Sequence, residues 1–432
     1  MDQPGSLSSG HASLADWLTW LETLSPAEID LGLDRVLEVL DRLQVARPDR
    51  VIHVAGTNGK GSSVAMLEAL FLKPGDRIGS YTSPHVTRYN ERIRINGEPV
   101  SDAQIIAAFE RVEAVRQSVP LTYFEYGTLA AIVILESSQV DTAILEVGMG
   151  GRLDAVNAIE PDAGIITNVS LDHCVWLGED IESIAVEKAG ILRSDKPFVF
   201  GAADVPDSIL VSAEKLGADL LLPGRDFEYT KDADNNTWSW SGRRLKLTGL
   251  EMPALSGDIQ LRNAAAVLAL VEALLLDELL DRELLNGAFG GLQLAGRCQT
   301  IRTDRKWLLD VAHNAEAASV LSDHLADMDT SARTIAIIGM LQDKDLSGIV
   351  SPLLDHVDSW IAVSADAARA LPGRELAAGI AHLSDKPCLI ADSPAEAMEH
   401  AREQTTAKDL ILVTGSFYVV GPALEWLKSN AR

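Results

Sequence analysis

The amino-acid sequence predicts an α/β protein of two domains, and three observations support this fold class. Short apolar runs alternate with stretches of helical spacing along most of the chain, a pattern typical of a mostly parallel sheet with helices on both faces. A glycine-rich turn follows the first apolar run and leads into a helix-like stretch. Near residue 297 glycines interrupt the series, and a second α/β series begins after them.

The first elements set up this pattern. Residues 1–13 are rich in Gly and Ser and are expected to be disordered. Apolar residues at helical spacing predict a helix over 14–24. An apolar run at 51–55, the glycine turn and a helical stretch over 62–72 then predict strand, turn and helix. Further apolar runs that lead into loops predict strands at 78–81, 142–146 and 164–168.

The chain between residues 226 and 297 departs from this alternation. Trp238 and Trp240 alternate with serine after a turn signal at 234–236, so we predict a small β-hairpin region over 226–248. Two helices are expected next, at about 259–276 and 281–289.

Glycines at 290, 291 and 296, followed by Arg297, are typical of a hinge. We therefore expect a first domain over 14–296 and a smaller, Rossmann-like α/β domain over 297–432. The strands of the second domain are predicted at 307–311, 334–338, 359–363, 388–390 and 410–413.

Composition limits the classes of partner. The chain has 432 residues, 37 Lys and Arg against 63 Asp and Glu, and a formal net charge of −26. The negative electrostatic field of such a chain repels phosphate groups, which argues against binding to nucleic acid or to an anionic membrane. The most apolar stretch, 264–280, is interrupted by acidic residues and is too short to span a bilayer. Three cysteines without a CxxC pair, and an N-terminus without a signal-peptide pattern, favour a cytoplasmic location.

The glycine-rich turn, Gly56 to Ser63, is a candidate phosphate-binding loop. Its backbone N–H groups, the helix N-terminus and Lys60 would together attract an anion inside an acidic protein. It varies the usual G-x-x-x-x-G-K-[ST] pattern, because Val54 stands where glycine is expected and Gly61 follows the lysine. The alternative is an ordinary glycine turn capped by Ser62. The strand-turn-helix context favours a P-loop-type domain that binds a nucleotide.

Three loops that follow apolar runs offer ligands for the Mg²⁺ that accompanies nucleotide phosphates. Because ligands bind at the carboxyl ends of strands in open α/β sheets, Ser83, Glu146 and the pair Asp172-His173 are candidates. Glu146 is the strongest, since a carboxylate that ends a buried strand is otherwise costly. Ser83 could instead be a turn hydroxyl, and Glu146 a helix cap or a salt-bridge partner. Asp172 could be a helix N-cap, and His173 an ordinary loop histidine.

Lys188 lies near the end of a helical stretch that begins at about Glu179. A lysine at a helix C-terminus is ordinary. A functional role would require Lys188 to point back towards the metal loops.

Together these motifs resemble the folylpolyglutamate synthase family. The matching segments, in an order and spacing that fit from about residue 14 to 428, are GTNGKGS at 56–62, YTSPH at 81–85, LEVGMGGRLD at 145–154, LDH at 171–173, EKAGI at 187–191, DVAHN at 310–314 and GSF at 415–417. IDLGL at 29–33 and TYFEYG at 122–127 are most similar to the bacterial bifunctional branch, dihydrofolate synthase/folylpolyglutamate synthase, which is related to the Mur ligases. Residues 1–13 and Cys174 depart from the pattern.

The resemblance implies a role for each matching position. ATP would be bound by Thr57, Asn58, Gly59 and Lys60 and, across the cleft, by Asn263, Arg297 and Asp310. Mg²⁺ would be held by Ser83, Glu146 and His173, with a monovalent cation as a further candidate. The pterin or folate would contact Ile29, Asp30, Leu31, Gly32, Thr122, Tyr123, Phe124, Glu125, Arg152, Leu153 and Asp154. The incoming glutamate would lie near His313 and Ser416. Lys60, a carbamylated Lys188 and His313 would serve catalysis.

The implied activity is that of an ATP-dependent ligase. It would add L-glutamate to 7,8-dihydropteroate, forming dihydrofolate, and to reduced folates, forming folylpolyglutamates, through an acyl phosphate. These small molecules would be its partners, and a cytoplasmic monomer is expected. Two alternatives stay open: a Mur-type ligase that acts on a cell-wall precursor, and a nucleotide-binding module without synthetic activity.

Overall fold

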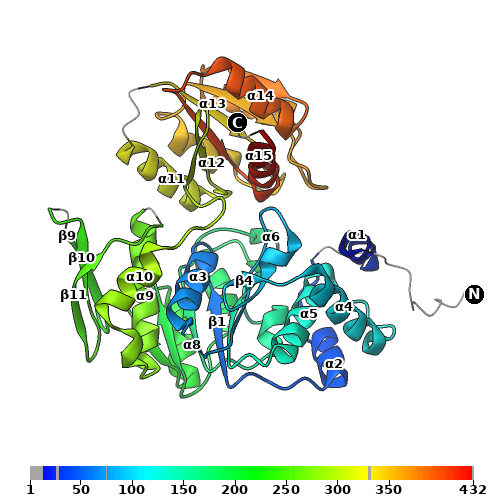
Figure 1. The fold of residues 1–432 in the computed structure, drawn as a ribbon, viewed down its shortest axis with the longest axis vertical. Coiled ribbons are helices and arrows are strands. Elements are labelled where there is room, and N and C mark those ends of the chain that lie inside the picture. Colours follow the sequence, from blue (N-terminus) through cyan, green and yellow to red (C-terminus); the bar gives the residue numbers. More distant parts are fainter. Residues whose placement is uncertain are drawn as a thin grey trace, which may run out of the picture.

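The computed structural model describes residues 13–25, 29–73, 75–232, 234–255, 257–328 and 332–430. Two α/β units lie one above the other in Figure 1, the N-terminal unit in blue to green and the C-terminal unit in yellow to red. Residues 1–12 of the expected disordered tail lie outside the described residues. Ser13 does not belong to such a tail, because its side chain accepts a hydrogen bond from the backbone N–H of Asp16 and caps α1 (Leu14–Leu24).

An eight-stranded sheet forms the centre of the N-terminal unit, in the order β4-β3-β2-β5-β1-β6-β7-β8. All neighbours pair in parallel except the antiparallel edge that β3 and β4 add. The strands are β1 (Arg50–Ala55), β2 (Ile78–Tyr81), β3 (Ile93–Ile95), β4 (Glu98–Pro99), β5 (Thr142–Glu146), β6 (Ala163–Ile166), β7 (Pro197–Phe200) and β8 (Asp219–Leu221). Because β1 lies between β5 and β6, Val54 pairs with Glu146 on one side and Ile165 on the other.

Helices cover both faces of this sheet. In β1, Ile52 and Val54 face the core formed with α3, α9 and α10, whereas Val51 and Ala55 face the core formed with α1, α2, α4, α5, α7 and α8. The helices after α1 are α2 (Asp34–Leu43), α3 (Lys60–Phe71), α4 (Asp102–Arg116), α5 (Tyr123–Ser137), α6 (Cys174–Leu177), α7 (Ile181–Ala189), α8 (Asp207–Leu216), α9 (Asp258–Ala273) and α10 (Arg282–Gly290). Short 3₁₀ turns are η1 (Tyr89–Arg92), η2 (Ala155–Ala158) and η3 (Asp277–Leu279).

The predicted hairpin region is an antiparallel sheet of three strands, β9 (Glu228–Asp232), β10 (Thr237–Ser241) and β11 (Lys246–Glu251). It lies at one side of the N-terminal unit, beside α9 and α10 (Figure 1). Trp238 and Trp240 point from its central strand into the core with α3 and α9. The alternation seen in the sequence thus marks the buried face of this sheet.

The C-terminal unit has a six-stranded sheet in the order β12-β13-β17-β14-β15-β16. Its strands are β12 (Gln299–Arg302), β13 (Lys306–Leu309), β14 (Thr334–Ile338), β15 (Ser359–Val363), β16 (Cys388–Ala391) and β17 (Leu410–Thr414). The helices are α11 (Ala315–Asp327), α12 (Leu346–Val350), α13 (Gly373–Leu383), α14 (Pro394–Gln404) and α15 (Phe417–Asn430), with η4 (Ser351–Leu353). One face packs on α14 and α15, the other on α11 to α13.

The predicted fold class is confirmed. Strand β6 ends two residues before its predicted end, because Thr167 and Asn168 turn to hydrogen bond the glycine loop. Strand β13 ends at Leu309, because the Asp310 carboxylate accepts backbone N–H groups of a turn. The antiparallel strand β12 was not predicted. The proposed domain boundary at residue 297 falls between α10 and β12.

Among the described residues, no helix combines the length and apolar character that a membrane crossing would need.

His53 in β1 leads to a prediction about acid stability. Its side chain is fully buried and neither ring nitrogen has a hydrogen-bond partner. Burial, with smaller effects of nearby Arg193 and Arg47, lowers its pKa to about 3. Below about pH 6.5 the unfolded chain therefore binds a proton at His53, whereas the folded chain keeps this side chain neutral down to about pH 3. The free energy of unfolding consequently falls as the pH drops from about 6.5 towards 3, by about 1.4 kcal/mol per pH unit for this one group.

His53→Leu should remove this slope and raise the free energy of unfolding at neutral pH by roughly 1–3 kcal/mol, because an unpaired polar group leaves the core. Urea unfolding at pH 7.5, 6 and 5 measures both effects. His382→Gln is the control, since His382 lies on the surface. Equal slopes for wild type and His53→Leu would contradict the prediction.

Candidate active site

A cavity of about 1220 Å³ lies where the two units meet. Its wall comes from loops at the carboxyl ends of strands in both sheets, those after β1, β2, β5 and β6 below and those after β14, β15 and β17 above. Most of the residues that the sequence singled out line it. The exceptions are Arg152, Asn263 and Asp310.

The glycine loop after β1 is closely packed. Gly56 and Gly59 have φ of 144° and 82°. A Cβ at Gly56 would lie 1.8 Å from Thr167 Oγ1, and one at Gly59 would lie 2.8 Å from Asn263 Nδ2. Glycine is thus required at both positions. Asn263 lies within α9; although absent from the cavity wall, it packs directly against the loop.

Lys60 begins α3, which has Gly59 rather than Ser62 as its N-cap. Its Nζ donates to the carbonyl oxygens of Gly56 and Thr57, both at 3.1 Å. Burial lowers the pKa of Lys60, although Glu146 opposes this effect. The ammonium group is therefore held inside the loop, at the helix end that favours anions.

Ser83 and Glu146 are adjacent, because β2 and β5 are neighbours in the sheet. The backbone N–H of Ser83 donates to Glu146 Oε2 at 3.0 Å. Burial raises the pKa of Glu146, and nearby Lys60 lowers it. His173 lines the same cavity, burial lowers its pKa to about 4, and its buried Nδ1 has no partner.

These side chains fit a hard cation in part. Glu146 and Ser83 offer oxygen ligands, and the neutral imidazole of His173 has a free nitrogen. Within the described residues, no three His, Cys, Asp or Glu side chains converge as a metal site. A metal ion here would therefore depend on the hydroxyl of Ser83, on phosphate oxygens and on water as well.

Lys188 is not an ordinary surface lysine at a helix end. It lies in the last turn of α7, is only 3% exposed and lines the cavity. Burial lowers its pKa to about 7, with a smaller contribution from Lys60. At neutral pH much of this amine is therefore uncharged.

The segments proposed for the pterin meet at one end of the cavity. Thr122 and Glu125 form a capping box at the start of α5. Arg35 joins the Glu125 carboxylate, at 2.9 Å, to the carboxylate of Asp30, at 2.8 Å. The loop 29–32 is thus tied to the start of α5.

The neighbouring loop after β5 contributes unevenly. Leu153 and Asp154 line the cavity, and burial raises the pKa of Asp154 to about 6 although backbone N–H groups of Met149 and Val156 bind its carboxylate. Arg152 points elsewhere and forms an ion pair with Glu187 at 2.7 Å. Its proposed contact with the pterin would need a different side-chain conformation.

The C-terminal unit supplies the opposite wall. Arg297 lies over the ring of Phe417, 5.5 Å from its centroid. His313 contacts the carbonyl oxygen of Val311 through Nδ1 at 2.8 Å, and burial lowers its pKa to about 4. Ser416 is buried before α15, and its hydroxyl accepts from the backbone N–H of Tyr418.

Asp310 lies behind this wall rather than in it. Its carboxylate accepts backbone N–H groups of Cys298 and Ala312, both at 2.8 Å. Burial raises its pKa, and nearby Arg297 lowers it. In this arrangement Asp310 shapes the turn that carries Arg297.

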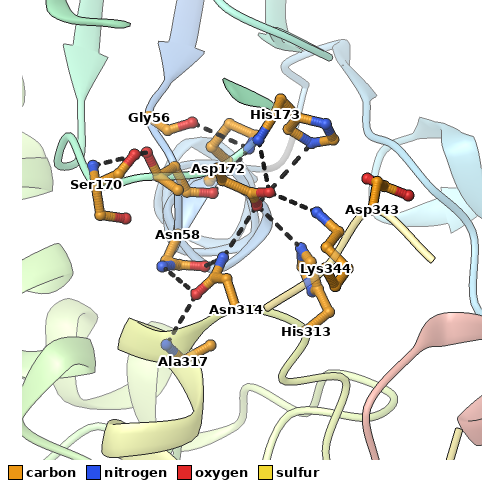
Figure 2. Close-up of polar contacts among 12 residues, drawn as sticks. Gly56, Asn58, Ser170, Asp172, His173, His313, Asn314, Ala317, Asp343 and Lys344 are labelled. Atoms are coloured by element: carbon orange, nitrogen blue, oxygen red, sulfur yellow. Dashed lines mark hydrogen bonds and ion pairs between the residues drawn. The ribbon is translucent and has the colours of Figure 1, made fainter. Parts of the chain in front are cut away.

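Asp172 connects the two units (Figure 2). Its carboxylate forms an ion pair with Lys344 and accepts a hydrogen bond from Asn314 Nδ2 at 3.1 Å, and His313 Nε2 lies 3.6 Å away. These three residues belong to the C-terminal unit. Burial by itself would raise the pKa of Asp172, but His173, Lys344 and His313 lower it below its usual value.

A second contact joins the glycine loop to the C-terminal unit. The side-chain amides of Asn58 and Asn314 exchange hydrogen bonds of 3.2 and 3.0 Å. Asn58 Nδ2 also donates to Glu316 at 2.8 Å. The units therefore contact each other beside the phosphate loop itself.

Comparisons with known proteins agree with this geometry. Residues 54–271 match the family model "Mur ligase middle domain", and residues 296–417 match "Mur ligase, glutamate ligase domain". The dihydrofolate synthase/folylpolyglutamate synthase of Escherichia coli K12 is 38% identical over 413 residues, which cover 95% of each chain.

The chain belongs to the dihydrofolate synthase/folylpolyglutamate synthase family of Mur ligases.

Solved structures of this family are similar along almost the whole chain. E. coli FolC in complex with DHPP and ADP has a TM-score of 0.91 and 36% identity, and the match covers 98% of this chain and 99% of that one. A bifunctional folylpolyglutamate synthase/dihydrofolate synthase with Mn, AMPPNP and L-glutamate bound has a TM-score of 0.87 and 38% identity, covering 96% and 98%. The family predicted from the motifs is confirmed, and nothing in these comparisons favours a cell-wall ligase.

For this member of the folylpolyglutamate synthase family, motif reasoning missed part of the cavity wall. Lys344 follows β14 and Arg369 follows β15, so the rule that ligands bind at strand carboxyl ends could have identified both loops. Arg92 carried no such signal, because it ends the short turn η1.

Proposed function

We propose that this chain is an ATP-dependent ligase that adds L-glutamate to 7,8-dihydropteroate and to reduced folates through an acyl phosphate. The observation that carries the proposal is a cavity that residues of both units line. It contains the phosphate loop, the candidate metal ligands and the rings of Tyr123 and Phe124 on one side, and Arg297, His313 and Ser416 on the other.

The N-terminal unit would bind ATP and activate the carboxylate of the acid substrate. Thr57 to Lys60 would surround the phosphates, supported by Asn263, while Arg297 and the turn shaped by Asp310 would contact the nucleotide from above. Mg²⁺ held by Ser83, Glu146 and His173 would neutralise phosphate charge. A carboxylate oxygen of the folate would attack the γ-phosphorus, and the bond to the bridging oxygen of ADP would break.

The C-terminal unit would then deliver the amine. The nitrogen of L-glutamate, placed near Ser416 and His313, would attack the acyl carbon, and phosphate would leave. His313 is neutral at physiological pH and could accept the proton that the amine loses. Closure of the units through Asp172 would keep water from the acyl phosphate.

Lys188 would carry a carbamate. An uncharged amine attacks CO₂, forms an N–C bond and loses a proton, which yields a carboxylate-like anion. The pKa of about 7 makes the uncharged amine abundant at neutral pH, where an ordinary lysine is almost fully protonated. The anion would face Lys60, the cation whose charge already lowers the pKa of Lys188.

We expect ¹³C-bicarbonate to give a carbamate NMR signal in the wild type that Lys188→Ala lacks and that the surface control Lys215→Ala retains. Activity should fall in CO₂-depleted buffer and return with bicarbonate. Lys188→Ala should lose about 10²–10³-fold in kcat, because a charge aimed at the reacting groups is removed. A wild type without the signal and without bicarbonate dependence would contradict the carbamate.

The test of the proposed function is substrate-dependent ADP release. The protein is incubated with MgATP, L-glutamate and either dihydropteroate or tetrahydrofolate, and mass spectrometry follows the folate. We expect ADP only when all substrates are present, with a product one glutamate heavier. ADP release with a muramyl peptide instead of a folate would contradict the proposal, as would none with either acceptor.

Three finer points stay predictions: a monomer, a cytoplasmic location and a monovalent cation beside the phosphates. Size-exclusion chromatography tests the first, and ADP release measured with and without K⁺ tests the third.

A further inference from the structure

Arg92 is a buried cation without an acidic partner. It ends η1, is 8% exposed and lines the cavity. Its Nε–H donates to His85 Nδ1 at 2.9 Å, and its guanidinium lies over the rings of Tyr89 and Tyr123, at 5.1 and 5.5 Å from their centroids. In the part of the chain that the structure describes, no carboxylate lies within ion-pair distance of it.

Three other cations in the cavity wall have oxygen acceptors. Lys60 donates to two backbone carbonyl groups, Lys344 pairs with Asp172, and Arg369 pairs with Asp343. A buried charge without a counter-charge is costly, so a protein keeps one mainly where a ligand supplies the missing charge. A planar guanidinium suits a carboxylate best, because two parallel N–H groups match its two oxygens.

The position of Arg92 indicates which substrate carboxylate would pair with its guanidinium. Its backbone carbonyl accepts the N–H of Thr82, which places it next to Ser83 and the candidate metal ligands. Its side chain lies against Tyr123, within the segment proposed for the pterin. The acid that ATP activates must extend from that segment to the metal end of the cavity, whereas His313 and Ser416 lie on the opposite unit.

We propose that the Arg92 guanidinium binds the carboxylate of the acid substrate and holds it for phosphoryl transfer. This inference rests on the proposed function and adds the residue that recognises the reacting group. His85 positions the guanidinium by accepting from Nε, and the rings of Tyr89 and Tyr123 pack against it. Recognition of the acid end is thus separate from recognition of the pterin ring.

The experiment compares two probes. One is 7,8-dihydropteroate, and the other is the analogue in which hydrogen replaces the benzoate carboxylate. Calorimetry with Mg²⁺ and AMPPNP present measures the affinity of each for wild type, Arg92→Gln and the charge-retaining Arg92→Lys. Wild type should bind the acid about 10–100-fold more tightly than the analogue.

Arg92→Gln should bind both probes with nearly equal affinity, at the wild-type value for the analogue, which also shows that the variant is folded. Arg92→Lys should retain part of the preference for the acid, because the positive charge stays while the two parallel N–H groups of the guanidinium are lost. In steady-state assays the loss should appear in kcat/KM for dihydropteroate, with the KM for glutamate unchanged.

A full preference for the acid in Arg92→Gln would overturn the inference. So would an equal loss of affinity for both probes, which would mean that Arg92 only supports the packing of Tyr89 and Tyr123. A higher KM for glutamate with the acid preference intact would also overturn it. A wild type that binds neither probe would overturn the proposed function together with the inference.

Discussion

Replacing Lys60 by methionine should lower kcat/KM for glutamate-dependent ADP release by about 10²–10³-fold, because a preorganised donor aimed at the phosphates is lost. Lys60 supplies the one full positive charge of a loop that must bind a triphosphate in a chain of net charge −26. The ammonium now rests on the carbonyl oxygens of Gly56 and Thr57, so it can turn to phosphate oxygens without a new backbone conformation.

The variant should fold as well as the wild type, since burial already disfavours the charged form of this lysine. Calorimetry with MgADP and thermal unfolding together separate lost nucleotide binding from lost folding. Lys215→Ala, at the exposed end of α8, is the matched control. Unchanged amide synthesis in Lys60→Met would disprove the proposed role of the loop.

Breaking the ion pair between Asp172 and Lys344 should have the second largest effect. Both side chains are 7% exposed. Asp172→Asn would leave the Lys344 ammonium buried without a counter-charge, at a cost of about 3–5 kcal/mol to the contact between the units. This contact holds His313 and Asn314 of the C-terminal unit beside Asp172 of the N-terminal unit. We therefore expect kcat/KM for glutamate to fall by about 10²-fold or more.

The double variant Asp172→Asn, Lys344→Met should recover much of the loss, since no buried charge is then unpaired. The control is Asp258→Asn, which breaks the exposed pair between Asp258 and Lys231 and should cost under about 1 kcal/mol. Steady-state kinetics and urea unfolding measure wild type, Asp172→Asn, Lys344→Met, the double variant and the control. If the losses of the two single variants simply add, the pair does not join the units.

Much of the site could be predicted because the chemistry is local to strand ends. Glu146 ends β5 and Ser83 follows β2, so residue type and the position of an apolar run were enough to identify both. The glycine loop was equally local, since strand, turn and helix are contiguous. Its physical requirement, positive φ at Gly56 and Gly59, was met as expected for glycine.

Other parts of the site depend on contacts between distant segments. Asp172 could be read as a helix N-cap, yet it contacts Lys344, 172 residues further along the chain. Arg152 lies within a matching motif, yet its side chain pairs with Glu187 outside the cavity wall. Side-chain direction and pairing of this kind follow from packing, which no local pattern encodes.

The sequence by itself determined the alternation of strands and helices, the phosphate loop and the family, because periodicity and contiguous motifs are local properties of a chain. Only the tertiary structure decided that Lys188 is buried and has a pKa of about 7. It also decided that Asp172 joins the two units and that Arg92 lines the cavity without an acidic partner. Burial and ion pairing depend on which distant segments exclude water together, so these properties exist only once the chain is folded.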